Sequence, residues 1–291
     1  MSPDTNSDFL KSLGFNLEGL AQLGTFMRNY ADNVARISAS MQPYIEKVTP
    51  TLAALVKIDW VAAKRQLDEL PTKSKEAMVL ASSKGWFFGW HESLPELMAL
   101  IEKLVVTEIT DVDELMGQYY RNNLQPFADE VVQKYPQRAS IIKAAVNAHC
   151  TFDPGGYFLS IPVFIAQADG LLTEITGVES AMMKTCNKPL ELQASRALRD
   201  KLGTDHKSLD LIYPILMLHE MDFMKSASER EKSAQSSGRS FTALNRHQVM
   251  HGESFDYGTE INSLKAFSFL VFVGLHMPLI LDSAHERPTQ G

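Results

Sequence analysis

The residues best suited to chemistry lie in one short stretch, NRHQVMHG, at positions 245–252. Within it, Arg246 is followed after four residues by His251. An arginine can hold phosphate oxygens through two parallel hydrogen bonds, and a histidine can take up or release a proton near neutral pH. Together they suit metal-free RNA cleavage, in which a 2′-hydroxyl attacks the neighbouring phosphate. On a straight helix the two positions lie about 140° apart, so we expect them to converge only near a frayed C-terminal turn or across paired subunits.

A carboxylate in an apolar segment gives a possible partner for this pair. Asp169 lies in YFLSIPVFIAQADGLLTEIT, residues 157–176, which is apolar nearly all round. Burying a carboxylate without a partner is costly. We therefore expect Asp169 to pair with Arg246 or to orient a motif histidine, with an ion pair that only fixes packing as the alternative.

Four further residues near the motif are secondary candidates: Asn245, His247, Asp256 and Tyr257. His247 and His251 share a helix face at the spacing of two metal ligands, so a metal-dependent protein is an alternative, with Asp256, Glu253 or Glu220 completing the shell. A structural interpretation is also open, in which His251 stabilises a helix C-terminus and Asp256 or Thr259 caps the final helix.

The stretch NRHQVMHG resembles the signature of the HEPN superfamily, which is an arginine, four to six residues and a histidine. The resemblance assigns Arg246 and His251 as the pair. It implies a helical bundle, a homodimer that brings two motifs together, and metal-independent endonuclease action on RNA. It covers residues 136–291 as a fold pattern. The sequence departs from members that place a tyrosine two residues after the histidine, because Glu253 occupies that position and Tyr257 lies six residues after His251.

The charge of the chain limits its expected contact with nucleic acid. The 291 residues include 35 acidic and 28 basic side chains, a net charge of −7, which argues against binding nucleic acid over the whole surface. The stretch 225–251 differs, with five basic and two acidic side chains and a net charge of +3. We therefore expect a small basic cleft around Arg246. The two cysteines, Cys150 and Cys186, and the absence of an export signal favour the cytoplasm.

Apolar residues recur at intervals of three and four almost throughout, which predicts an all-α helical bundle. Expected helices span residues 60–70, ended by Pro71, then 94–106, 112–120, a helix starting at Pro126, 137–149, 157–176, 209–225, 241–251 and 259–281. Residues 232–240 are expected to form a Ser-rich loop. The aromatic turn Gly85–Trp90 is expected to fill a core.

The N-terminal region carries a heptad-like apolar seam at residues 20–48, interrupted by Pro43, which predicts two helices at 16–41 and 44–57. The seam could pack within its own domain or form a dimer. We expect an N-terminal helical region at 1–135 and a HEPN-like domain at 136–291. The apolar run at 266–281 has sixteen positions, fewer than the roughly 20 that a membrane span needs, so we expect a buried core helix and no membrane span.

The function expected from these residues and the resemblance is that of a metal-independent endoribonuclease in a toxin or phage-defence setting, without cofactor or bound metal. Expected partners are RNA, a second copy of the chain, and a protein bound by the N-terminal helices. The alternative is a non-catalytic helical RNA-binding or protein-interaction module. An open basic cleft at Arg246 favours the enzyme, and full burial of Arg246 and His251 favours the module.

Overall fold

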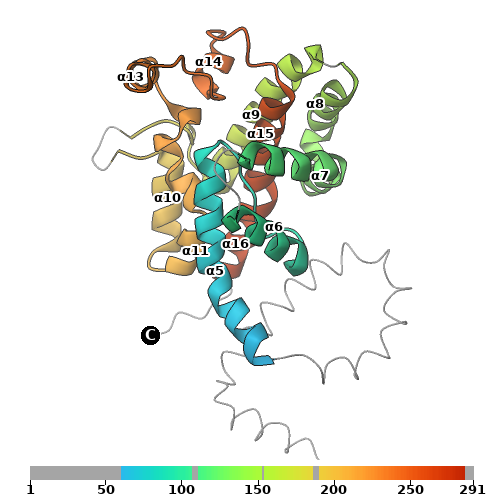
Figure 1. The fold of residues 1–291 in the computed structure, drawn as a ribbon, viewed down its shortest axis with the longest axis vertical. Coiled ribbons are helices and arrows are strands. Elements are labelled where there is room, and N and C mark those ends of the chain that lie inside the picture. Colours follow the sequence, from blue (N-terminus) through green and yellow to red (C-terminus); the bar gives the residue numbers. More distant parts are fainter. Residues whose placement is uncertain (1–59, 107–110, 153, 186–189, 286–291) are drawn as a thin grey trace, which may run out of the picture. The chain divides into compact units, whose positions relative to one another are not determined.

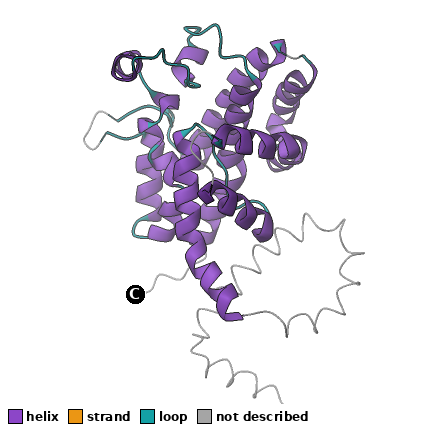
Figure 2. Ribbon diagram, in the orientation of Figure 1, coloured by secondary structure: helices purple, strands orange, loops and turns teal. Residues whose placement is uncertain are grey.

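The computed structural model describes residues 60–106, 111–152, 154–185 and 190–285. The seam at 20–48 and Cys186 lie outside these residues. The expected all-α fold is confirmed for the described residues, which form helices and turns with one isolated bridge between Lys184 and Leu192 (Figure 2).

The chain divides into two compact units, residues 1–65 and 66–291. The division expected near residue 135 therefore falls inside the second unit. Residue 135 does not separate two units because the helix that ends just before it packs against both the next helix and the helix at 260–271.

The α-helices are α5 (Trp60–Ser83), α6 (Leu94–Val106), α7 (Val112–Lys134), α8 (Ala139–Thr151), α9 (Gly155–Thr176), α10 (Gln193–Leu202), α11 (His206–Leu211), α12 (Tyr213–Leu216), α13 (Ala227–Ser237), α14 (Arg246–Met250), α15 (Glu260–Val271) and α16 (Met277–His285). Short 3₁₀ helices occur at η3 (Pro136–Arg138), η4 (Leu218–Glu220) and η5 (Asp222–Met224), and a π-helical turn, η6 (Phe272–His276), joins α15 to α16. In the second unit α9 and α15 lie side by side, with α8 against α9 and α7 against α15 (Figure 1).

Two helical segments are long and apolar enough to cross a membrane by length and composition. The segment Glu260–Ala284 has 83% of its most apolar window buried inside the protein, as expected of a core helix. The segment Gly155–Thr176 has only 39% of its window buried. The absence of a membrane span therefore stays a prediction.

Several helix boundaries differ from those expected at prolines. Pro71 and Pro126 lie inside α5 and α7, which continue through them. A proline inside a helix costs about 3 kcal/mol, and in α7 the burial of Leu124 and Phe127 on either side of Pro126 offsets that cost.

Other segments are shorter or longer than expected. The single helix expected at 209–225 is broken into α11, α12, η4 and η5, and Pro214, which lacks an N–H, stands in the first turn of α12. The Ser-rich segment is helical as far as Ser237, because Ser226 and Glu229 form a capping box that starts α13. The helix expected at 241–251 is confined to α14, which begins where the Asn245 side chain caps it.

The aromatic turn fills the core as expected. Trp86, Phe87 and Phe88 are at most 1% exposed. The turn is also fastened by hydrogen bonds, since the backbone N–H of Phe87 donates to Ser268 Oγ (3.2 Å) and that of Trp90 to His276 Nδ1 (2.9 Å).

Candidate functional site

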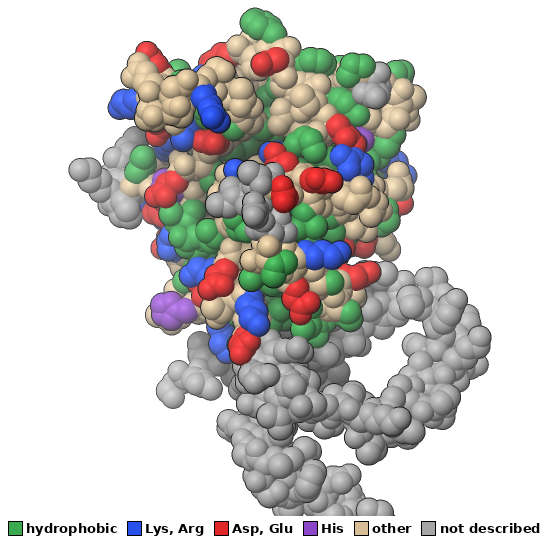
Figure 3. Space-filling view, in the orientation of Figure 1, with side chains coloured by type: hydrophobic (Ala, Val, Ile, Leu, Met, Phe, Trp, Pro, Cys, Tyr) green, Lys and Arg blue, Asp and Glu red, His purple; other side chains and the backbone are tan. Residues whose placement is uncertain are grey.

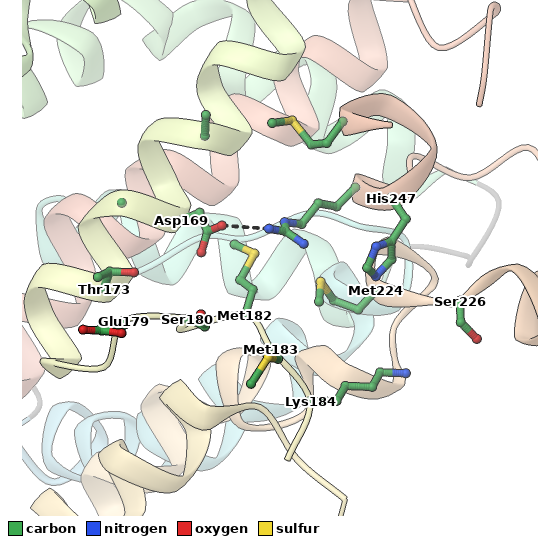
Figure 4. A pocket seen from close by; sticks show the side chains of 14 residues that line it. Asp169, Thr173, Glu179, Ser180, Met182, Met183, Lys184, Met224, Ser226 and His247 are labelled. Atoms are coloured by element: carbon green, nitrogen blue, oxygen red, sulfur yellow. Dashed lines mark hydrogen bonds and ion pairs between the residues drawn. The ribbon is translucent and has the colours of Figure 1, made fainter. Parts of the chain in front are cut away.

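A pocket of about 650 Å³ lies between α9, the segment 179–184, the start of α13 and α14 (Figure 4). Its polar lining consists of Asp169, Thr173, Glu179, Ser180, Lys184, Ser226, Arg246 and His247. Four methionines add apolar surface: Met182, Met183, Met224 and Met250. The pocket therefore joins part of the NRHQVMHG motif to residues 70 or so positions earlier in the chain.

The ion pair predicted between Asp169 and Arg246 is present. Arg246 Nη2 donates to Asp169 Oδ2 at 2.9 Å, across the space between α14 and α9 (Figure 4). The two side chains are 24% and 28% exposed, so this pair is neither fully buried nor free in solvent. Arg246 Nε is buried without a hydrogen-bond partner. The carboxylate thus fixes one edge of the guanidinium and leaves another donor unused.

Asn245 holds the start of α14 and is not available to a substrate. Its side chain is buried, and Oδ1 accepts hydrogen bonds from the backbone N–H of Gln248 (3.1 Å) and from Arg230 Nη1 (3.1 Å). Its Nδ2 donates to the carbonyl oxygens of Asp222 (2.7 Å) and Lys225 (3.0 Å). Two acceptor and two donor positions are the full capacity of a carboxamide, so the role of Asn245 is to position α14.

Arg230 links the residues before α14 to Glu253, which follows α14. This side chain is buried, donates to the carbonyl oxygen of Lys225 and forms an ion pair with Glu253. Because Arg230 and Glu253 neutralise each other, one of the basic residues counted in the sequence is committed to the fold.

The two motif histidines have different surroundings. His247 lines the pocket, whereas His251 is exposed just after the last residue of α14 and is not among the lining residues. Their rings stack, with centroids 6.0 Å apart and planes 9° from parallel. Burial lowers the pKa of His247, and the positive charge of Arg246 lowers it further, so the ring is neutral near pH 7. Arg246 and His247 therefore line the same pocket, and His251 contacts this pair only through its ring, which stacks on that of His247.

The remaining sequence candidates point elsewhere. Asp256 is exposed and accepts a hydrogen bond from Ser254 Oγ (2.8 Å). The Tyr257 hydroxyl donates to the carbonyl oxygen of Phe158 (3.2 Å), and its ring contacts that of Phe158. Thr259 caps α15 by accepting from the N–H of Asn262 (3.2 Å), as one of the two expected caps. Asp256 and Tyr257 thus belong to the loop and its packing, and neither lines the pocket.

The pocket lining is not basic, contrary to the cleft expected from the local charge count. Lys184 and Arg246 are balanced by Asp169 and Glu179, and Lys184 also donates to both carboxylate oxygens of Glu229 (3.1 and 3.0 Å). The face seen in Figure 3 likewise shows acidic and basic side chains intermingled. The charge count over residues 225–251 gave the wrong sign for the pocket because the compensating carboxylates, Asp169 and Glu179, lie outside that range in the sequence.

No group of three or more His, Cys, Asp or Glu side chains within the described residues could hold a metal ion.

The pocket-lining residues that the sequence did not predict include Lys184 and Ser226. The Ser226–Glu229 capping box is a recognisable signal for the start of a helix. This signal does not predict which pocket the N-terminal end of α13 would line.

Comparison with protein-family models, with curated proteins and with solved structures gave no match for this chain. The HEPN resemblance therefore depends on the motif residues alone.

Proposed function

We propose that the pocket binds an RNA phosphate and that the protein is a metal-independent endoribonuclease. The observation that carries this proposal is the presence of Arg246 and His247 in one open pocket, with Arg246 oriented by Asp169. A guanidinium held in this way has a fixed direction in which to offer its remaining N–H groups to a phosphate. Arg246 would stabilise the charge that grows on the phosphate oxygens during attack.

The proton transfers would involve both histidines. His247 would accept the proton of the 2′-hydroxyl as its oxygen attacks phosphorus, and His251 would supply a proton to the departing 5′-oxygen. The products would be a 2′,3′-cyclic phosphate and a free 5′-hydroxyl. The lowered pKa of His247 supports its role as the base, and the stacking of the exposed His251 ring on His247 supports its role as the proton donor.

The test is incubation of the purified protein with mixed RNA in the presence of EDTA. We expect cyclic-phosphate ends, with activity lost in Arg246→Ala and in His247→Ala, and reduced in His251→Ala. His206, a histidine outside the pocket on α11, supplies a matched control in His206→Ala. Equal cleavage by wild type and the Arg246 variant would contradict the proposal.

A non-catalytic helical module that binds RNA or protein is the second candidate. It is favoured by the balanced charge of the lining and by the ion pair that already occupies one edge of Arg246. The same incubation separates the two candidates, because the module would bind RNA or another partner without producing cyclic-phosphate ends.

A further inference from the structure

A second pocket, of about 380 Å³, adjoins the pocket that Arg246 lines. Its volume lies within the range of roughly 300–1,000 Å³ that is typical of ligand sites. Part of its wall is one face of α10, with four lining residues: Gln193, Arg196, Ala197 and Asp200. The segment 178–185 supplies the rest of the described lining. Met183 and Lys184 of this segment line both pockets, so the two pockets together form one groove.

The second pocket has the excess of positive charge that the first pocket lacks. Two basic side chains, Lys184 and Arg196, and one acidic side chain, Asp200, line it, which gives a formal charge of +1. In the first pocket two basic and two acidic side chains cancel. The groove therefore attracts an anionic ligand mainly at the end formed by α10.

Arg196 is held in a fixed direction and has donors left over. Its Nε donates to Glu191 Oε1 at 3.1 Å, and its Nη groups have no hydrogen-bond partner among the described residues. These Nη groups are not among the buried atoms that lack partners, so solvent reaches them. The Glu191 side chain is only 9% exposed and does not line the pocket. The buried carboxylate therefore orients the guanidinium, whose remaining N–H groups are available to a phosphate.

The same arrangement occurs at the other two basic residues that line the groove. Arg246 pairs with Asp169, and Lys184, which lies where the two pockets adjoin, donates to both carboxylate oxygens of Glu229. Cations that follow one another along a groove suit the repeated phosphates of a single-stranded nucleic acid. The apolar side chain of Met183, 52% exposed between them, offers a surface on which a ribose or a base can pack.

We propose that the groove binds at least two consecutive nucleotides of single-stranded RNA. This inference rests on the part of the proposed function that places an RNA phosphate at Arg246. Arg196 would hold the neighbouring phosphate, through its free Nη groups, in the second pocket. Arg196 is then a binding residue that favours RNA with more than one phosphate and does not touch the reacting atoms.

The experiment measures, by fluorescence anisotropy, how the full chain binds mixed-sequence 2′-O-methyl RNA, in which the attacking hydroxyl is blocked and cleavage is prevented. A dinucleotide offers one phosphate to the groove, and a trinucleotide offers two. The wild type should bind the trinucleotide about fivefold more tightly, as expected for one further partly exposed ion pair. Its binding should also depend more steeply on salt, by about 0.7 in the slope of log K against log salt for one further phosphate.

Arg196→Ala should abolish both the trinucleotide preference and the added salt dependence. Arg199→Ala is the matched control, because Arg199 also pairs with Glu191 (3.4 Å) from the same helix but does not line the groove. This control should keep the preference. Asp200→Asn provides an independent variant, because it removes an exposed carboxylate from the second pocket and should increase the preference.

The proposal is overturned if the wild type binds the two oligomers equally, if it binds neither, or if Arg196→Ala keeps the same preference as Arg199→Ala. Cleavage of unmodified RNA by the wild type separates this proposal from the ribonuclease. Cleavage combined with no effect of Arg196→Ala on the preference would contradict only the two-nucleotide groove. An Arg196-dependent preference without cleavage would support the groove and contradict only the ribonuclease.

Discussion

Protonation of His276 should destabilise the protein in acid by an amount that the structure allows to be calculated. The ring is fully buried in η6, where Nδ1 accepts from the N–H of Trp90 (2.9 Å) and Nε2 donates to the carbonyl oxygen of Leu211 (2.8 Å). These contacts select the neutral tautomer with its proton on Nε2. A second proton on Nδ1 would place a donor against the donor of Trp90. Burial accordingly lowers the pKa of His276 from 6.5 to about 4.

The sign and size of the effect follow from proton linkage. Above pH 6.5 the ring is neutral in both states, so its full contribution to stability is present. As the pH falls, the unfolded chain binds the proton first and the folded state does so only near pH 4, so stability is lost over this interval. The loss is about 2 kcal/mol at pH 5 and approaches about 3 kcal/mol at pH 4.

The assay is urea denaturation followed by circular dichroism across this pH range, for wild type and His276→Gln. Glutamine does not titrate and keeps a donor for the Leu211 carbonyl. The variant should be less stable at neutral pH, but its stability should fall less steeply in acid. His91 protonates at lower pH, because burial and, to a smaller extent, the charges of His276 and Lys134 lower its pKa to about 3. Identical acid slopes for the two proteins would refute the assignment of the neutral tautomer.

Substitutions at three further positions test the packing around the site and the core. Asn245→Ala should lower the free energy of unfolding by about 1–3 kcal/mol, measured by urea denaturation, because it removes a cap and leaves buried partners unpaired; a neutral result would contradict the hydrogen-bond network. Gly89→Ala should cost about 2–3 kcal/mol in the same assay, since its added Cβ would lie 2.3 Å from His276 Cβ; an unchanged melting temperature would show that the loop can move away. Asp169→Ala should cost about 1 kcal/mol because the pair with Arg246 is partly exposed. Asp169→Asn should cost less, because its amide oxygen still accepts, and equal losses would argue against a directional hydrogen bond.

The sequence anticipated the fold class and one long-range contact. Apolar residues at helical spacing predicted an all-α protein, and this held wherever the structure describes the chain. The pairing of Asp169 with Arg246 was predicted, with a motif histidine as the alternative partner, because a carboxylate in an apolar helix needs a partner. The continuation of α5 through Pro71 and of α7 through Pro126 was not predictable, because core packing on both sides of a proline can offset its local cost.

Which residues line the pocket could not be predicted from neighbouring positions in the sequence. The spacing of Arg246 and His251 singled out the short helix, yet the tertiary structure placed the adjacent His247 in the pocket and left His251 exposed and outside the lining. The charge count around Arg246 indicated a basic cleft, and the carboxylates that neutralise it came from α9 and the segment after it.

The sequence by itself therefore determined the all-α class and placed an arginine and two histidines on one short segment. The tertiary structure decided which of these three groups share a pocket, and it used Asn245 and Arg230 to hold α14 in place. The physical reason is that helix formation depends on residues three or four positions apart, whereas burial, charge compensation and hydrogen-bond completion depend on residues brought together only when helices pack.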